Sequence, residues 1–345
     1  MKKILLQNNE NGFKYYKANL HCHSTMSDGK KTPEEIKRYY INRGYSAIAY
    51  TDHDVFITHN DLTDDSFVAL NGFEFEIVMD NNKRTCHLCY VALDKNNKKS
   101  VCYHRTKYLV NHNEQNRHLL TFDENEPDYE RVYSPECIND MIEKGRQNGF
   151  FVTYNHPTWS QEDYPQYMSY NGMNAMEMVN YGCVLEGYDE YNGRVYNDML
   201  SGGKRIYCVA TDDNHNCGKE EYDDSFGGYV MISARELSYE ALTESMLCGR
   251  FYSATGSRTE DGPIVEYLEY DDKKVYIKTS PVKEINLICG SRTNMSKRDT
   301  LGGTVEFAEF PIRGNTEWFR IECIDENGHK AYTNAYFTDE LEKEI

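Results

Sequence analysis

The sequence predicts an α/β protein in two parts: a barrel-like region of alternating strands and helices, followed by a small antiparallel β-sandwich. Up to residue 257, short apolar runs alternate with segments of helical periodicity, a pattern typical of α/β domains with largely parallel strands. After that point no long helical period remains, and short runs alternate apolar with polar residues. We therefore predict domains at residues 1–257 and 258–345.

Seven segments of the first domain have the composition of strands. They are SAIAYTDH (46–53), SFVALNGFE (66–74), RTCHLCYVAL (84–93), FFVTYNHP (150–157), NAMEMV (174–179), RIYCVATDDNH (205–215) and GGYVMIS (227–233). Interleaved with helices, these strands are enough to close a barrel.

Three helices are predicted from their first residues. Thr32, Pro33 and Glu35 give a cap, a proline at the first helical position and a glutamate three residues after the cap, opening a helix to about Arg43. Ser134 and Ser238 open two more, which end near Gly149 and Gly249. The polar and poorly periodic segment 95–130 is predicted to be an insertion or a lid-like excursion.

In the second domain the alternating runs predict strands without helices. They are KKVYIKTS (273–280), EINLICG (284–290), TVEFAEF (304–310), EWFRIECID (317–325) and KAYTNAYF (330–337).

The composition excludes several classes of protein. With 38 basic and 56 acidic residues the formal charge is −18, which disfavours binding along an extended nucleic acid. The amino-terminal apolar triplet is too short for a signal peptide, and no window approaches the apolar length of a membrane span. Eleven cysteines at irregular spacing indicate reduced thiols, so we expect a cytoplasmic protein.

One C-x-x-C pair occurs, formed by Cys86 and Cys89. Without a second pair it is weak evidence for a zinc knuckle, and the apolar run around it is typical of a strand.

Side chains that can bind metal recur at or just past the carboxyl ends of the predicted strands. They are His21, His23, Asp28, Asp52, His53, Asp54, Glu74, Glu76, His87, His156, Asp212, Asp213 and His215. In barrel-like α/β folds active sites are built at this end of the strands. Imidazoles and carboxylates without thiolates suit zinc, manganese or iron in a hydrolytic site. Two histidines one residue apart on a strand point to the same side and can chelate one ion.

Each of these features alone has a simpler explanation. A single His-x-His occurs at surface strand ends, Asp52 and Asp54 could belong to a polar turn, and Glu74 could be a solvated strand residue. The joint pattern along the chain is what favours a metal site.

The sequence resembles the polymerase and histidinol phosphatase (PHP) family of metal-dependent phosphoesterases. The resemblance rests on NLHCHSTMSDG, AYTDHD, NGFEFE, CHLCYVAL, NHP and ATDDNH, in the family's order. The helix with GRFY near residue 251 and the β-rich end are similar to the carbaryl-hydrolase-like subgroup, in which a small β domain follows the barrel.

The resemblance implies a distorted (β/α)7 barrel with two or three divalent ions (Zn, Mn or Fe) at its mouth. His21, His23 and Asp213 would hold one ion. Asp28, His53 and His215 would hold a second, although some relatives have histidine where this chain has Asp28. The third site would be completed by His87 and His156, and Glu74 matches the bridging carboxylate.

Two of these assignments stay open on the sequence alone. Asp212 is the second choice for the closing aspartate, because only Asp213 keeps the Asp-x-His spacing. Glu76 lies on the same strand face as Glu74 and is the alternative bridging ligand.

We expect a phosphoesterase in which a metal-bound water, held at Glu74 and Asp213, attacks a small phosphomonoester or phosphodiester such as a nucleotide or sugar phosphate. Arg84 is the candidate for binding the phosphate, ahead of other basic residues of the neighbouring segments, namely Lys83, Arg105, Lys107 and Arg117. The alternatives are a carboxyl ester, carbamate or amide hydrolase with the same site, and a binding module whose barrel is a relic.

Overall fold

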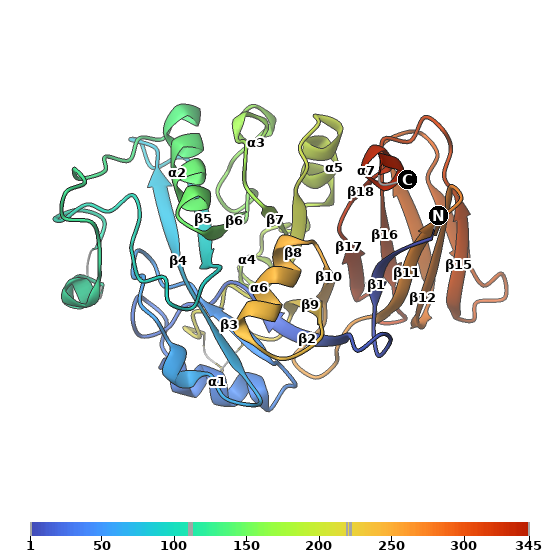
Figure 1. Ribbon diagram of the computed structural model, residues 1–345, viewed down its shortest axis with the longest axis horizontal. Coiled ribbons are helices and arrows are strands. Elements are labelled where there is room, and N and C mark those ends of the chain that lie inside the picture. Colours follow the sequence, from blue (N-terminus) through green and yellow to red (C-terminus); the bar gives the residue numbers. More distant parts are fainter. Residues whose placement is uncertain (1, 110–112, 219, 221–222, 344–345) are drawn as a thin grey trace.

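Strands and helices alternate along the first part of the chain. The computed structural model describes residues 2–109, 113–218, 220 and 223–343. One large sheet takes the strand order β10-β9-β2-β3-β4-β5-β6-β7-β8 (Figure 1). These strands are β2 (Lys14–Asn19), β3 (Ala47–Tyr50), β4 (Val68–Val78), β5 (Thr85–Ala92), β6 (Phe150–Tyr154), β7 (Ala175–Asn180), β8 (Tyr207–Thr211), β9 (Gly228–Ala234) and β10 (Phe251–Thr255).

The sheet is mixed, which confirms an α/β protein with parallel strands. Parallel ladders join β2 to β3, β3 to β4, β6 to β7 and β7 to β8. The prediction of a largely parallel sheet is wrong for β5, which runs antiparallel to both neighbours, and for β9 and β10. Among the described residues no ladder joins β8 back to the other edge, so the closed barrel stays a prediction.

The three predicted helices are present. They are α1 (Pro33–Ile41), α2 (Pro135–Gln147) and α6 (Tyr239–Leu247). The Thr32 hydroxyl accepts a hydrogen bond from the Glu35 amide, and the Glu35 carboxylate accepts one from the Thr32 amide, so the predicted capping box forms.

Several short helices were not predicted. They are α3 (Tyr164–Ser169), α4 (Tyr181–Leu185), α5 (Gly193–Ser201), the terminal α7 (Thr338–Lys343) and the 3₁₀ turns η1 (Asn60–Leu62) and η2 (Glu114–Leu119). In Figure 1, α2, α3 and α5 form a row along the upper side of the sheet, and α1 lies below it.

The carboxyl-terminal part is antiparallel in all its described pairings, as predicted. Its strands are β11 (Val265–Asp271), β12 (Lys274–Val282), β13 (Glu284–Cys289), β14 (Met295–Arg298), β15 (Val305–Pro311), β16 (Trp318–Ile324), β17 (Lys330–Thr333) and β18 (Tyr336–Phe337). A separate four-stranded sheet has the order β1-β11-β12-β15, and its first strand, β1 (Lys3–Gln7), comes from the amino terminus.

The remaining carboxyl-terminal strands extend the large sheet, because β17 pairs with β10. Leu268 and Ile277 of the separate sheet share one hydrophobic cluster with Ile285 and Ile321 of the extension. Two strand pairings therefore connect the two parts of the chain: β1 with β11, and β10 with β17. The domain boundary after residue 257 stays a prediction.

The segment 95–130 contains only η2 as regular structure among its described residues, and residues 110–112 lie outside them. It packs beside the strand ends, where the side-chain amide of Asn113 donates to the His53 carbonyl at 2.8 Å and that of Asn116 to the Met26 carbonyl at 2.7 Å. The insertion thus contacts two loops that carry predicted ligands.

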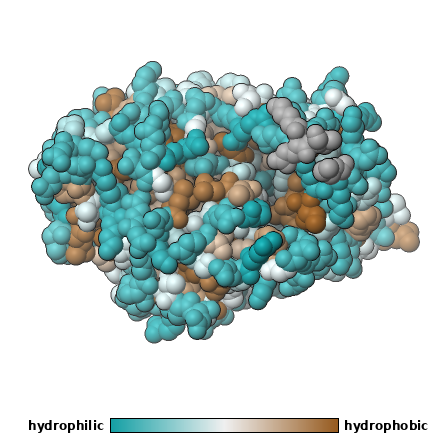
Figure 2. Space-filling view, in the orientation of Figure 1, coloured by the Kyte–Doolittle hydropathy of each residue, from teal (hydrophilic) through white to brown (hydrophobic). Residues whose placement is uncertain are grey.

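Hydrophilic side chains cover most of the face seen in Figure 2, in keeping with the mean hydropathy of −0.77. Within the described part of the chain, no helix has both the length and the apolar composition needed to cross a membrane. The eleven cysteines are all free.

Candidate metal centre

A cavity of about 740 Å3 lies where the predicted ligands gather. His21 and His23 follow β2, His53 follows β3, and Asp213 and His215 follow β8. Because β2, β3 and β4 are parallel neighbours, the loops after β2 and β3 leave the sheet at the same edge. The backbone of His53 forms an isolated parallel β-bridge with that of Glu74 in β4.

His87 reaches the site by a different route from the one predicted. It is the third residue of β5 rather than a residue at its carboxyl end, and it pairs in register with Glu76 of β4. Because β5 runs antiparallel to β4, its beginning lies at the same edge as the end of β4. The predicted location is therefore wrong in direction, although His87 lines the same cavity.

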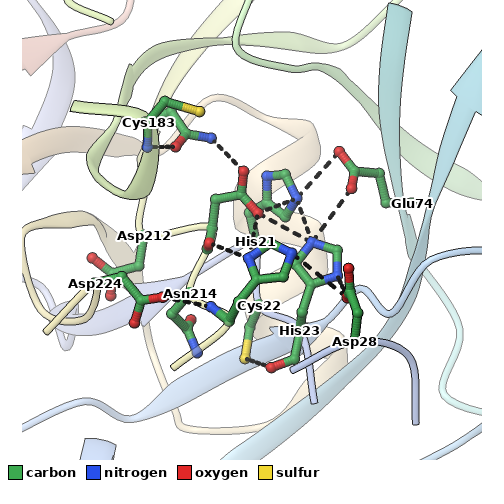
Figure 3. Close-up of polar contacts among 12 residues, drawn as sticks. His21, Cys22, His23, Asp28, Glu74, Cys183, Asp212, Asn214 and Asp224 are labelled. Carbon is green, nitrogen blue, oxygen red and sulfur yellow. Dashed lines mark hydrogen bonds and ion pairs between the residues drawn. The ribbon is translucent and has the colours of Figure 1, made fainter. Parts of the chain in front are cut away.

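The first cluster contains His21, His23 and Asp213. Figure 3 shows the two histidine rings side by side. The two Nε2 atoms lie 3.1 Å apart, and each lies 3.1 Å from Oδ1 of Asp213. Ligand atoms around one ion at bonds of about 2.0–2.1 Å stand about 3.3 Å from one another in a tetrahedron. The buried Oδ1 makes no hydrogen bond, which leaves it available to a cation.

The second cluster is wider and more open. Asp28 Oδ1 lies 3.6 Å from Nε2 of His215 and 3.7 Å from Nδ1 of His23, and Asp28 Oδ2 lies 3.8 Å from Nε2 of His53. The Asp28 side chain is 46% exposed, so this cluster meets solvent. Nδ1 of His23 is buried without a hydrogen-bond partner.

Glu74 lies at the centre and contacts all three clusters. In the third cluster its Oε1 is 3.1 Å from Nδ1 of His87 and 3.4 Å from Nε2 of His156. The same carboxylate lies 3.2 Å from His21, 3.3 Å from His23 and 3.2 Å from His53. Glu76, the alternative bridging residue, is 47% exposed and contacts only His87 in this group.

The charges of this site depend on one another. Burial alone would raise the pKa of Glu74, but His21 and His87 hold it well below its ordinary value. Burial alone would lower the pKa of His23 and His87, yet the carboxylates beside them raise both values to about 10. The buried acids therefore need positive charge next to them, which divalent ions would supply in place of protons.

His53 differs from these histidines. Burial and the neighbouring His23 lower its pKa to about 4, so its imidazole is neutral at neutral pH. A neutral imidazole has a lone pair available for a metal ion.

Asp212 has a separate role from Asp213. Its carboxylate accepts hydrogen bonds from the amides of Phe226, Gly227 and Gly228 and from the Tyr40 hydroxyl, at 2.7–2.9 Å. Figure 3 shows it set apart from His21, His23 and Glu74. With its oxygens used by four donors, Asp212 is poorly suited to bind an ion.

The basic residues considered for phosphate binding lie away from the cavity. Arg84 forms an ion pair with Asp163 at 2.8 Å and is not among the cavity-lining residues. Lys107, Arg105 and Arg117 pair with acidic residues of their own segment. No lysine or arginine lines the cavity within the described part of the chain.

Cys86 and Cys89 do not form a common site. Cys86 packs in the hydrophobic core, whereas Cys89 lies beside His21 and Glu74. Among the described residues, no group of potential ligands contains both thiols.

Several residues of the centre were missed by the sequence reading. Glu177 contacts His21, and Asn155 contacts Glu74. Trp159 lines the cavity, and its ring lies edge-on to that of His156 with the ring centroids 4.9 Å apart. Glu177 had a usable signal, since a lone glutamate stands in the apolar run NAMEMV.

The comparisons with known proteins are weak. No family model and no curated protein matches the sequence. A solved two-domain protein from Bacteroides vulgatus that contains a predicted PHP-like metal-dependent phosphoesterase is similar over 97% of this chain and 99% of its own, at 15% identity and a TM-score of 0.45. An amidohydrolase from Chromobacterium violaceum, with bound sulfate and no metal, is similar over 59% of this chain and 89% of its own, at 15% identity and a TM-score of 0.41.

Proposed function

We propose that the chain is a metal-dependent phosphoesterase that hydrolyses a small phosphomonoester or phosphodiester. The observation that carries the proposal is the single buried carboxylate, Glu74, in contact with five histidines of three ligand clusters. Divalent ions bound there would lower the pKa of water and offset the charge that builds on a phosphate.

The proposed ligand sets follow the three clusters. His21, His23 and Asp213 hold the first ion, Asp28, His53 and His215 the second, and His87 with His156 the third, while Glu74 bridges between sites. The unpartnered buried atoms Oδ1 of Asp213 and Nε2 of His87 support the first and the third of these sets. Zinc, manganese and iron all suit such ligands.

The protein's own side chains favour water as the nucleophile. Two thiols, those of Cys183 and Cys217, line the cavity. Burial raises the pKa of both thiols, so neither is a ready thiolate at neutral pH. The nucleophilic water is proposed to be held at Glu74 and Asp213.

We also infer that the large sheet forms the distorted (β/α)7 barrel of the PHP family. One buried cluster collects apolar side chains from successive strands of the sheet, namely Ala18, Ala47, Leu70, Val91, Phe151, Ala175, Val209 and Val230. At the open edge, the Ser253 hydroxyl of β10 donates to the Cys208 carbonyl of β8 at 2.7 Å. Both observations support strands that curl around a common interior.

The remaining proposals concern setting and partners. The charge of −18 supports a small phosphorylated substrate over an extended nucleic acid. A cytoplasmic location is proposed from the eleven free cysteines.

A phosphoester panel combined with elemental analysis tests the proposal. Protein loaded with zinc, manganese or iron should hydrolyse at least one ester. The variant His21→Ala should bind less metal and should lose the activity. His59→Ala is the matched control, because His59 is also buried but belongs to none of the three clusters. Failure on a broad panel of phosphomonoesters and phosphodiesters would refute the proposal.

A second candidate is a carboxyl ester, carbamate or amide hydrolase. It is favoured by the absence of lysine and arginine from the described cavity lining, where Glu76, Glu186 and Asp223 are found instead. An uncharged carbonyl substrate needs no such cations, whereas a phosphate relies on the ions alone. Turnover of carboxyl esters with no turnover of phosphoesters would decide for this candidate.

A further inference from the structure

Glu177 is a fully buried charge in the middle of a strand. It lies in β7, whose six residues are all buried, and its own side chain has no exposed surface. A buried carboxylate is stable only where hydrogen bonds or opposite charges satisfy it. The identity of its partners therefore indicates what the residue is for.

Four donors satisfy this carboxylate. Oε1 lies 2.7 Å from Nδ1 of His21 and 2.6 Å from the Thr211 hydroxyl. Oε2 lies 2.8 Å from the amide of His156 and 2.9 Å from Nδ2 of Asn180. The Asn180 amide cannot be reversed, because its Oδ1 accepts a hydrogen bond from the Cys183 amide.

This arrangement fixes the proton of His21. Both oxygens of Glu177 act only as acceptors, so Nδ1 of His21 must carry the proton of that contact. Nε2 is then the atom that offers its lone pair to the first cluster, where it faces Asp213 Oδ1 at 3.1 Å. A carboxylate behind a ligating histidine orients the ring and selects its tautomer in this way.

The other oxygen reaches two more parts of the centre. It holds the amide of His156, whose φ of +22° is unusual for a residue with a side chain. Asn180 passes a second hydrogen bond on to Asp213 Oδ2 at 3.0 Å. One carboxylate thereby supports ligands of the first and the third cluster.

We propose that Glu177 is a positioning residue that holds His21 in its ligating tautomer and fixes the backbone of His156. The inference rests on the proposed function, because it concerns residues assigned there as metal ligands. Glu177 stands close enough to His21 and His156 to share an ion with them. We assign it no ligand role because its four hydrogen bonds use the lone pairs of both carboxylate oxygens.

The variant Glu177→Gln tests the proposal because it keeps the size and replaces one acceptor by an NH2 donor. If the NH2 group of the glutamine takes the place of Oε2, it meets the His156 amide and Nδ2 of Asn180, which are both donors and cannot accept. If the NH2 group takes the place of Oε1, the Thr211 hydroxyl can rotate and accept a hydrogen bond, and only His21 must change its tautomer. The second orientation is therefore favoured, and it forces the His21 proton onto Nε2, which removes a ligand from the first cluster.

The matched control is Glu190→Gln. Glu190 is equally buried and accepts hydrogen bonds from the amides of Thr158 and Trp159 and from Asn192. It feels the charge of His156, but its described hydrogen bonds include none to a proposed ligand. Both variants remove one buried carboxylate charge from the same region. A difference between them therefore reports the contacts to the ligands.

The experiment measures the affinity of the metal-free protein for Zn²⁺ by competition with a chromophoric chelator, with thermal unfolding of each metal-free variant alongside. We expect Glu177→Gln to weaken the tightest site roughly 10- to 100-fold, while Glu190→Gln stays within about threefold of wild type. Unchanged affinity in Glu177→Gln, or an equal loss in both variants, would overturn the inference.

Glu177→Asp covers the case in which the glutamine variant does not fold. It keeps the charge and the acceptors but shortens the side chain, so the contact to His21 is stretched. We expect a loss of at least about threefold, smaller than that of the glutamine variant. An aspartate variant with wild-type affinity would overturn the inference.

The two proposals fail in different ways. Wild-type protein that binds Zn²⁺ tightly but hydrolyses no ester would refute the proposed function and leave the role of Glu177 standing. Wild-type protein that binds no ion would refute both.

Discussion

Replacing the adjacent aspartates 212 and 213 one at a time should give two unrelated defects. Asp212→Ala removes the acceptor for the amides of Phe226, Gly227 and Gly228, which it binds at 2.8–2.9 Å. Each buried donor left without a partner costs about 1–3 kcal/mol, so the loss is at least about 3 kcal/mol. For 345 residues the unfolding entropy is about 0.7 kcal/mol per degree, which converts this loss to about 4 °C or more.

The affinity for ions should fall in the variant of Asp213 and change little in the variant of Asp212. Asp213→Asn keeps the shape and can still accept from Asn180, but it removes the charge at Oδ1, which lies 3.1 Å from His21 and His23. We expect its Zn²⁺ affinity to fall more than about tenfold. Asp212→Ala should stay within about threefold, because its backbone still bonds to Asn19 and Gly182.

Thermal scanning of chelator-treated protein and chelator competition separate the two effects. Chelation matters because ion release would otherwise contribute to the melting temperature. An Asp212→Ala variant that melts within about 1 °C of wild type would contradict the energy assigned to the three amides. Equal losses of affinity in both variants would contradict the assignment of Asp213 over Asp212.

Three further predictions concern the ions, a buried carboxyl group and a close backbone contact. Removing the ions should lower the melting temperature, and Zn²⁺ at about 100 times its dissociation constant should restore about 2.7 kcal/mol; a melting temperature independent of Zn²⁺ would contradict a folded-state ion site. Burial raises the pKa of Glu162, which accepts from Tyr133 and Tyr154, so the folded state binds a proton that the unfolded chain releases, and the free energy of unfolding should rise as pH falls from neutral toward the ordinary pKa of 4.5. In urea titrations of metal-free protein Glu162→Gln should show a smaller rise than wild type, because Asp212, whose pKa burial raises to about 7, still contributes. Equal pH slopes in the two proteins would refute the assignment to Glu162. A Cβ on Gly228 would lie 2.1 Å from the Thr211 carbonyl oxygen, whereas one on Gly314 meets nothing within 4 Å. In urea unfolding, Gly228→Ala should therefore cost at least about 2 kcal/mol more than Gly314→Ala, and a smaller difference would show that the backbone of β8 shifts to relieve the contact.

The alternation of strands and helices was predictable because each element has a local pattern. The capping box at Thr32 and the apolar strand runs are signals of neighbouring residues, and both are present in the structure. The direction of β5 was not predictable, since a fully buried apolar run looks the same in a parallel and an antiparallel strand. The pairing of β1 with β11 joins residues far apart in the chain, and no local pattern encodes it.

The candidate ligands could be found because they stand at strand ends and belong to few residue types. One of the two choices that the sequence left open was between Asp212 and Asp213, which follow β8 directly. Side-chain direction after a strand depends on the backbone turn, and Asp213 has a φ of +51° that no local signal specifies. The amides of 226–228, which donate to Asp212, belong to the first residue of β9 and the two residues before it.

The residues missed by the sequence reading share a position beneath the strand-end ligands. Glu177 lies two residues after Ala175, and Ala175 packs in the cluster that fills the interior of the large sheet, so the two side chains point to the same face. Met176 and Met178, on the other face, pack in a different cluster under the helices. Glu177 and Thr211 therefore form a polar layer between the apolar interior and the ligands, and a search limited to strand ends cannot find it. A charged residue within a strand that is otherwise apolar is the signal of such a layer, because the cost of its burial must be met by nearby groups that depend on it.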